Sequence, residues 1–105
     1  MTTMRVSAIC GVLSVILAPG AALAADANHG GELAKRWCAS CHIVSADQKS
    51  GSTQAPPFSA VAKRPHFDQS RLAYFLLDPH PKMPDMGLSR NDANDLAAFI
   101  ATQKK

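Results

Sequence analysis

The sequence predicts a small all-α domain with long loops. Apolar residues recur at spacings of three and four in several segments, as they do on one face of a helix. Residues that cap helices precede these segments. No segment alternates between apolar and polar residues as a half-buried strand would. The chain has 105 residues, which is enough for one small domain.

The N-terminal stretch has the pattern of a secretory signal peptide. Arg5 provides a basic start, residues 6–17 are mostly apolar and uncharged, and Ala22-Leu23-Ala24 forms a small-x-small cleavage site. We therefore predict a cleaved signal at residues 1–24 and a domain at residues 25–105. The alternative is an uncleaved membrane anchor, because residues 4–25 are nearly long enough to span a bilayer. The cleavage site favours export without stable membrane insertion.

The first half of the predicted domain contains one helix and one long loop. A helix is expected over residues 31–38, with Asp26 or Asn28 as its N-cap. Residues 45–54 are polar and include Gly51, which indicates a surface loop.

The second half contains three helical segments. Residues 58–62 can form one helical turn, and residues 70–77 form a helix rich in large apolar groups after Asp68 as N-cap. A proline-rich loop follows. The last helix opens at Ser89 with a Ser-x-x-Asp capping pattern, and its apolar residues follow the i, i+3, i+4, i+7 rule: Ala93, Leu96, Ala97 and Ile100.

The most informative stretch is Cys38-Ala39-Ser40-Cys41-His42. A Cys-x-x-Cys-His run is the signature for covalent attachment of a c-type haem. Residues three apart lie on the same side of a helical turn, so both thiols can add to the vinyl groups of one porphyrin. His42 can then offer an imidazole nitrogen to the iron.

Other uses of Cys38 and Cys41 are less well supported. A disulfide between them would close only a tiny loop. A structural zinc site normally needs four ligands, and the sequence has no second cysteine pair to complete them. A thioredoxin-like redox pair belongs in a βαβ setting that the pattern lacks. The third cysteine, Cys10, would leave with the signal peptide.

The charge balance gives little support to a nucleic-acid partner. The chain has 11 Lys and Arg against 8 Asp and Glu, a formal net charge of +3, and the basic residues are scattered. Loss of Arg5 with the signal would lower that charge further. Some of these residues could border a docking face for another protein.

The order of these segments resembles that of class I cytochromes c of the small bacterial periplasmic kind. The shared order is helix, Cys-x-x-Cys-His, proline loop, middle helix, Met-Pro loop and C-terminal helix, over residues 26–103. The resemblance implies a cytochrome c fold, with three to four short helices wrapped around one covalently bound haem c and its iron. It also implies that Cys38 and Cys41 form the thioether bonds and that His42 is the proximal iron ligand.

The same resemblance suggests the other residues of the haem pocket. The second ring nitrogen of His42 would donate to a backbone carbonyl in the proline loop, for which Pro56 is the best match, and Phe58 would lie against the haem. Gly30 or Gly31 would pack where the first and last helices cross, against Leu96 and Phe99.

The sixth iron ligand has several candidates. Met83 lies between Pro81 and Pro84 in the loop that matches the family's Met loop, and a thioether there would raise the reduction potential. Met86 is the main rival and His80 is third. The remaining candidates are His66 and His29.

These expectations predict a periplasmic one-electron carrier that shuttles electrons between redox partner proteins and is not itself an enzyme. It would be a monomer or a small subunit of a redox complex. The alternatives are a dedicated cytochrome subunit of a periplasmic dehydrogenase, or a haem-based gas sensor or peroxidase with an open distal site.

Overall fold

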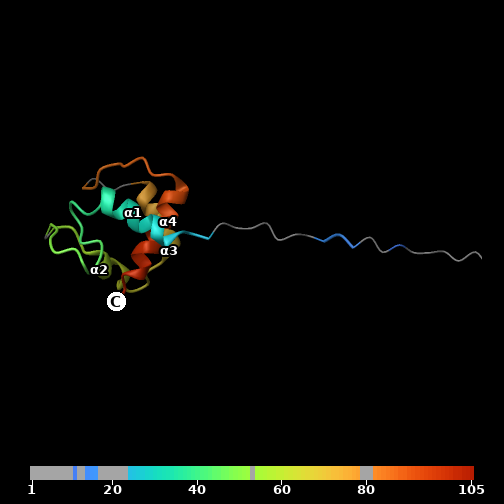
Figure 1. Ribbon diagram of the computed structural model, residues 1–105, viewed down its shortest axis with the longest axis horizontal. Coiled ribbons are helices and arrows are strands. Elements are labelled where there is room, and N and C mark those ends of the chain that lie inside the picture. The colour runs from blue at the N-terminus through green and yellow to red at the C-terminus, as the bar shows by residue number, and fades with distance from the viewer. Residues whose placement is uncertain (1–10, 12–13, 17–23, 53, 79–81) are drawn as a thin grey trace, which may run out of the picture.

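The computed structural model describes residues 11, 14–16, 24–52, 54–78 and 82–105. This part of the chain contains four helices and no strand: α1 (Ala27–Trp37), α2 (Phe58–Ala62), α3 (Gln69–Leu77) and α4 (Arg90–Thr102) (Figure 1). The all-α prediction is therefore confirmed. Most of the predicted signal peptide lies outside the described residues.

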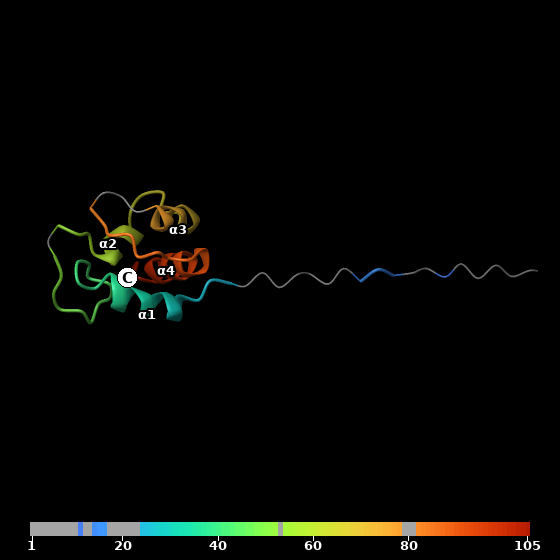
Figure 2. The same ribbon diagram turned by 90° about the horizontal axis from the view of Figure 1, so that it is seen from above.

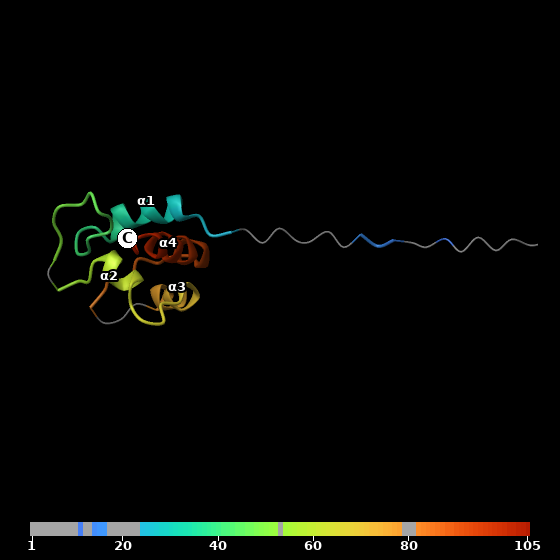
Figure 3. The ribbon, with the colours of Figure 1, turned by 90° about the horizontal axis from the view of Figure 1, so that it is seen from below.

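Helix α4 is the centre of the fold. It lies between α1 and α3, as Figures 2 and 3 show from opposite sides, and α2 also packs against it. One apolar cluster joins the four helices and the loop after α1; its buried members are Ala34, Cys38, Val44, Phe58, Ala62, Ala73, Leu76, Ala93, Leu96, Ala97 and Ile100. The apolar face predicted for the last helix is the face that supplies the middle of this core.

The helix starts follow the capping signals. Asp68 accepts from the backbone N–H of Arg71, and Ser89 and Asp92 form a reciprocal capping box. Asp26 caps α1, which begins at Ala27 and not at Gly31 as predicted. Two glycines make the first turn of α1 a poor helix former by propensity, and the Asp26 carboxylate offsets this by accepting from Asn28 and His29 N–H groups.

The crossing of α1 and α4 depends on the two glycines. A Cβ atom on Gly30 would lie 1.9 Å from the backbone oxygen of Asp95, so the two helix backbones meet at this point. A Cβ on Gly31 would lie 3.1 Å from ring carbons of Phe99. The predicted packing of Gly30 and Gly31 against Leu96 and Phe99 is therefore present, with the backbone contact at Gly30 being the closer one.

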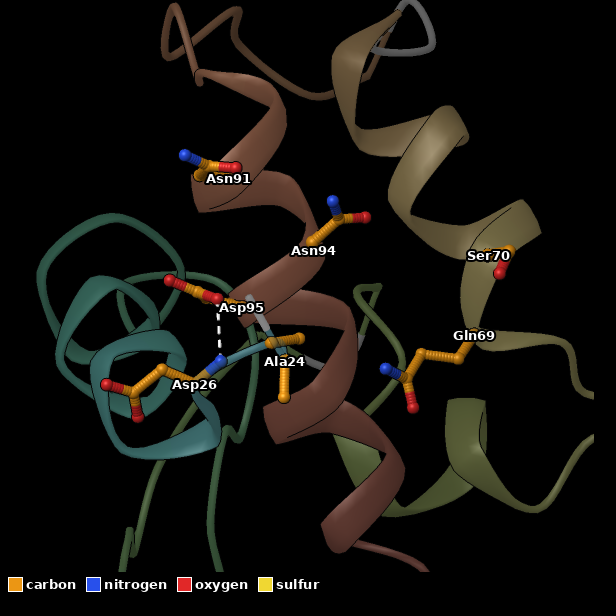
Figure 4. Close-up of a pocket in the computed structure, with 8 residues that line it drawn as sticks. Ala24, Asp26, Gln69, Ser70, Asn91, Asn94 and Asp95 are labelled. Atoms are coloured by element: carbon orange, nitrogen blue, oxygen red, sulfur yellow. Dashed lines mark hydrogen bonds between the residues drawn. The ribbon is translucent and has the colours of Figure 1, made fainter. Parts of the chain in front are cut away.

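A second contact between α1 and α4 is made by one carboxylate. Asp95 Oδ1 accepts the backbone N–H of Asp26 at 2.7 Å, and its Oδ2 lies 2.7 Å from Nδ1 of His29. The hydrogen bond to Asp95 raises the pKa of His29, with smaller contributions from the negative charges of Asp95, Asp92 and Asp26. Figure 4 shows the Asp26–Asp95 bond at the edge of a polar hollow between α3 and α4.

Two long loops complete the domain. Residues 43–57 connect the end of the Cys-x-x-Cys-His turn with α2, and residues 78–89 connect α3 with α4. None of the helices in the described ranges has the length and apolar content needed to cross a lipid bilayer.

Candidate functional site

The Cys-x-x-Cys-His stretch forms a tight turn at the end of α1. The N–H of Cys38 still donates to Ala34 O, and the N–H groups of Cys41 and His42 both donate to Cys38 O, at 3.1 and 2.8 Å. This turn buries the Cys38 side chain, leaves Cys41 exposed and half-buries His42.

The two cysteines are not joined to each other by a disulfide. Burial, together with the nearby Cys41, raises the pKa of the Cys38 thiol to about 11, so this thiol stays protonated at neutral pH. A redox-active dithiol needs the opposite shift, because its thiolate is the nucleophile. No group of three or more His, Cys, Asp or Glu side chains within the described residues could hold a metal ion such as zinc together.

His42 is oriented by the proline loop. Its Nδ1 lies 2.7 Å from the carbonyl oxygen of Pro56. A carbonyl oxygen can only accept, so Nδ1 carries the ring proton and Nε2 keeps its lone pair for a metal. The ring also contacts buried Phe58, with centroids 5.3 Å apart, and Phe58 in turn meets Phe99 edge to face at 6.3 Å. Both pocket residues predicted from the sequence therefore contact the His42 ring.

A crevice runs beside His42. It consists of two hollows of about 430 and 240 Å³, and Cys38, His42, Pro56 and Met83 line both. The larger hollow is mostly apolar, and its other lining residues are Phe58, Val61, Arg64, Arg71, Leu72, Phe75, Leu76, Leu96 and Ile100. Sizes and linings of this kind are typical of cofactor sites.

The candidates for the sixth ligand differ in whether they line the crevice. Met83 lines both hollows and packs against the core, whereas Met86 lines the smaller hollow but not the larger. His29 is bound to Asp95, and His66 is exposed with a φ of 60°; neither lines the crevice. His80 lies outside the described residues, and so does Pro81, one of the two prolines expected to restrain Met83.

These residues fit a haem of the c type. The turn offers two thiols three residues apart, and the hydrogen bond to Pro56 leaves His42 with one unprotonated ring nitrogen. The larger hollow is apolar around Phe58, and a methionine and a histidine both line it. When bound, haem c would supply an iron that cycles between the ferrous and ferric states. Cys38 and Cys41 would hold the porphyrin, and His42 would hold the iron.

The sequence did not single out several lining residues. Arg64 and Arg71 add two basic residues to the lining of the larger, mostly apolar hollow, and their charge suits the two carboxylates of a haem. Leu72 and Phe75 come from one face of α3 at the i, i+3 spacing, and this spacing could have marked them in advance. By contrast, the sequence alone does not show which residues of the other helices line the same crevice as these two α3 residues.

A larger hollow of about 510 Å³ lies elsewhere, between α3, α4 and the start of α1 (Figure 4). Carboxylates, amides and a hydroxyl line it, and none of the residues of the Cys-x-x-Cys-His turn does. Its lining is Ala24, Ala25, Asp26, Gln69, Ser70, Asn91, Asn94 and Asp95. Its size alone therefore does not make it the functional site.

The fold and the site together define an all-α protein that attaches a c-type haem. Comparison with known proteins agrees. Residues 25–100 match the family model described as "Cytochrome C oxidase, cbb3-type, subunit III". The chain is 54% identical to cytochrome c-552 of Bradyrhizobium diazoefficiens over 99 residues, which cover 94% of this chain and 95% of that protein. No solved structure matched the chain.

The chain therefore belongs to the cytochrome c family and is a small mono-haem class I cytochrome c. It carries a covalently bound haem c with its iron and is a haem-based electron carrier. The prediction of fold, cofactor and carrier function is confirmed.

Proposed function

We propose that this protein is a periplasmic one-electron carrier, exported by a signal at residues 1–24, that passes electrons between redox partner proteins. In this proposal Cys38 and Cys41 would form the two thioether bonds to the haem, and His42 and Met83 would hold its iron. No side chain acts as acid, base or nucleophile, so the protein is not an enzyme.

The observation that carries the proposal is the shared lining of the crevice by His42 and Met83. An iron held by both of these side chains would have no open position for a substrate or gas. A thioether also stabilises ferrous iron relative to a second imidazole, and so suits a carrier of higher potential. Buried Cys38 and exposed Cys41 support a haem with one edge near the surface, where electrons could pass during docking.

A matched pair of methionine variants tests the ligand assignment. Met83→Ala should lower the reduction potential, by on the order of 100 mV or more, and remove the weak sulfur-to-iron charge-transfer band. Met86→Ala is the control and should keep both. The reverse result would assign the sixth position to Met86. Rapid carbon monoxide binding to the ferrous wild-type protein at neutral pH would instead support an open-site sensor or peroxidase.

The mass of the exported protein tests attachment and cleavage together. Residues 25–105 plus one haem are expected. A mass equal to the bare residues 25–105 would contradict covalent attachment, and a retained N-terminal segment would contradict cleavage.

A second candidate is a dedicated cytochrome subunit of a respiratory enzyme. The matched family model is described as a subunit of an oxidase, which supports this candidate. The enzyme that contains the subunit could equally be a periplasmic dehydrogenase. Gel filtration of native extract distinguishes the two roles. A carrier should elute as a small monomer, whereas a subunit should elute with its enzyme.

A further inference from the structure

The backbone around the Cys-x-x-Cys-His turn exposes several carbonyl oxygens that α1 cannot satisfy. The loop that follows and the first residue of α2 supply partners for them. Ser52 N–H donates to Cys41 O and Phe58 N–H donates to Ile43 O, both at 2.9 Å. The carbonyls of Ala39 and His42 have a different kind of partner, because both accept from one side chain.

That side chain is Gln48. Its Nε2 lies 2.7 Å from His42 O, 3.0 Å from Ala39 O and 2.9 Å from Ser50 O. Its Oε1 accepts the N–H of Val44 at 2.9 Å. One half-buried amide group therefore connects the turn, the residues directly after it and the loop. The shortest of these contacts is the one to His42.

We propose that Gln48 is a positioning residue for His42, and through His42 sets the reduction potential of the haem. His42 is held at three points: its backbone N–H donates to Cys38 O within the turn, while Pro56 O holds its ring and Gln48 Nε2 holds its carbonyl from the loop. Pro56 belongs to the same loop as Gln48. The amide of Gln48 therefore fixes how far the His42 backbone lies from the carbonyl that orients its ring. The inference rests on the proposed role of His42 as proximal ligand.

The expected consequence concerns the Nδ1–H···O bond to Pro56. This bond makes the imidazole a stronger electron donor and favours ferric iron. Without Gln48 the His42 carbonyl loses its bond to the loop that carries Pro56, the Nδ1–H···O bond becomes longer on average, and the ligand becomes a weaker donor. The reduction potential should then rise.

The test uses the haem-loaded protein with Gln48→Leu, which has a side chain of similar size without an amide. Gln69→Leu is the matched control, because Gln69 is an exposed glutamine at the start of α3 and does not line the crevice. Two quantities are measured: the reduction potential, and the hydrogen-exchange rate of the His42 Nδ1–H, followed by NMR. In the Gln48 variant the potential should rise and exchange should be about tenfold faster, as for the loss of one hydrogen bond. The control should match the wild type in both.

A purely structural role for Gln48 predicts a different result. The melting temperature of Gln48→Leu would fall, while the potential and the Nδ1–H exchange rate stayed at their wild-type values, and this would overturn the proposal. If the leucine variant fails to fold, Gln48→Met replaces it. Methionine is neutral and of similar length but has no N–H to donate to the carbonyls, and the same rise and faster exchange are expected.

The wild-type spectrum separates this inference from the proposed function. If the His42 ring signals lack the shifts that bonding to iron causes, the proposed proximal ligand is wrong. If those shifts are present and the Gln48 variants do not differ from the wild type, only the positioning role is wrong.

Discussion

Gly30→Ala should strongly destabilise the protein, because the two helix backbones meet at Gly30. The added Cβ would lie 1.9 Å from Asp95 O, 2.4 Å from the Asp95 carbonyl carbon and 2.9 Å from Leu96 N. Ordinary van der Waals contact of a Cβ begins at 3.4 Å, so α1 and α4 must separate locally by about 1.5 Å, the difference between 3.4 and 1.9 Å. All three neighbours are backbone atoms of a central helix and cannot move aside independently.

The size of the stability loss in Gly30→Ala follows from two opposing effects. Overpacking of a tight core contact costs about 1–3 kcal/mol, and the upper end applies where backbone blocks the new atom. Replacing glycine by alanine inside a helix returns about 1 kcal/mol through helix propensity. The net loss is about 2 kcal/mol, which corresponds to a fall in melting temperature of roughly 8–16 °C for a domain of this size.

The assay is thermal unfolding of the haem-loaded protein, followed by circular dichroism, with Gly31→Ala as control. Gly31 lies in the same helical turn and receives the same gain in propensity. Its new Cβ would meet only the Phe99 ring at 3.1 Å, and a ring edge can shift by a few tenths of an ångström. The control should therefore melt near the wild-type temperature. Equal melting temperatures for the two variants would refute the backbone contact as the reason for glycine at position 30.

Two further predictions concern the core and the pH dependence of stability. Phe58→Ala should cost about 3–5 kcal/mol, since it removes a buried ring that packs on His42; the yield and melting temperature of the haem-loaded protein should both fall, whereas Phe58→Leu should lose much less. His29 has a pKa raised above 6.5 by Asp95, so its protonated form stabilises the fold; that contribution is complete below pH 6.5 and is lost as the pH rises through the raised pKa. The melting temperature should decline over this range, and a decline of the same size in His29→Gln would contradict the assignment.

The parts of the fold that were predictable are those fixed by local chemistry. Capping at Asp68 and at Ser89 depends on a few neighbouring residues, and the apolar face of α4 repeats within one segment. The start of α1 was misplaced because Asn28, Gly30 and Gly31 disfavour a helix locally. The Asp26 cap and the α4 surface against which α1 packs stabilise it there.

The residues of the candidate site also fall into two groups, those that could be predicted from the sequence and those that could not. The Cys-x-x-Cys-His run is contiguous, so its spacing alone identifies its chemistry. Pro56 and Phe58 could be expected only through the family resemblance, since their contacts with His42 close a loop. Gln48 could not be recognised, because a glutamine in a polar loop carries no periodic signal and its four contacts exist only once the loop has folded back on the turn.

This division implies that Gly30, at the helix crossing, and the iron-binding loops affect stability and reduction potential differently. The crossing at Gly30 holds α1 and α4 together but does not line the crevice, whereas His42 and Met83 stand outside the four helices, in loops that do line it. The reduction potential follows the axial ligands and the hydrogen bonds to them. A change at Gly30 should therefore move the melting temperature at nearly constant potential, while changes at His42 and Met83 should move the potential. The helices would then serve as a rigid frame within which the loops adjust the iron.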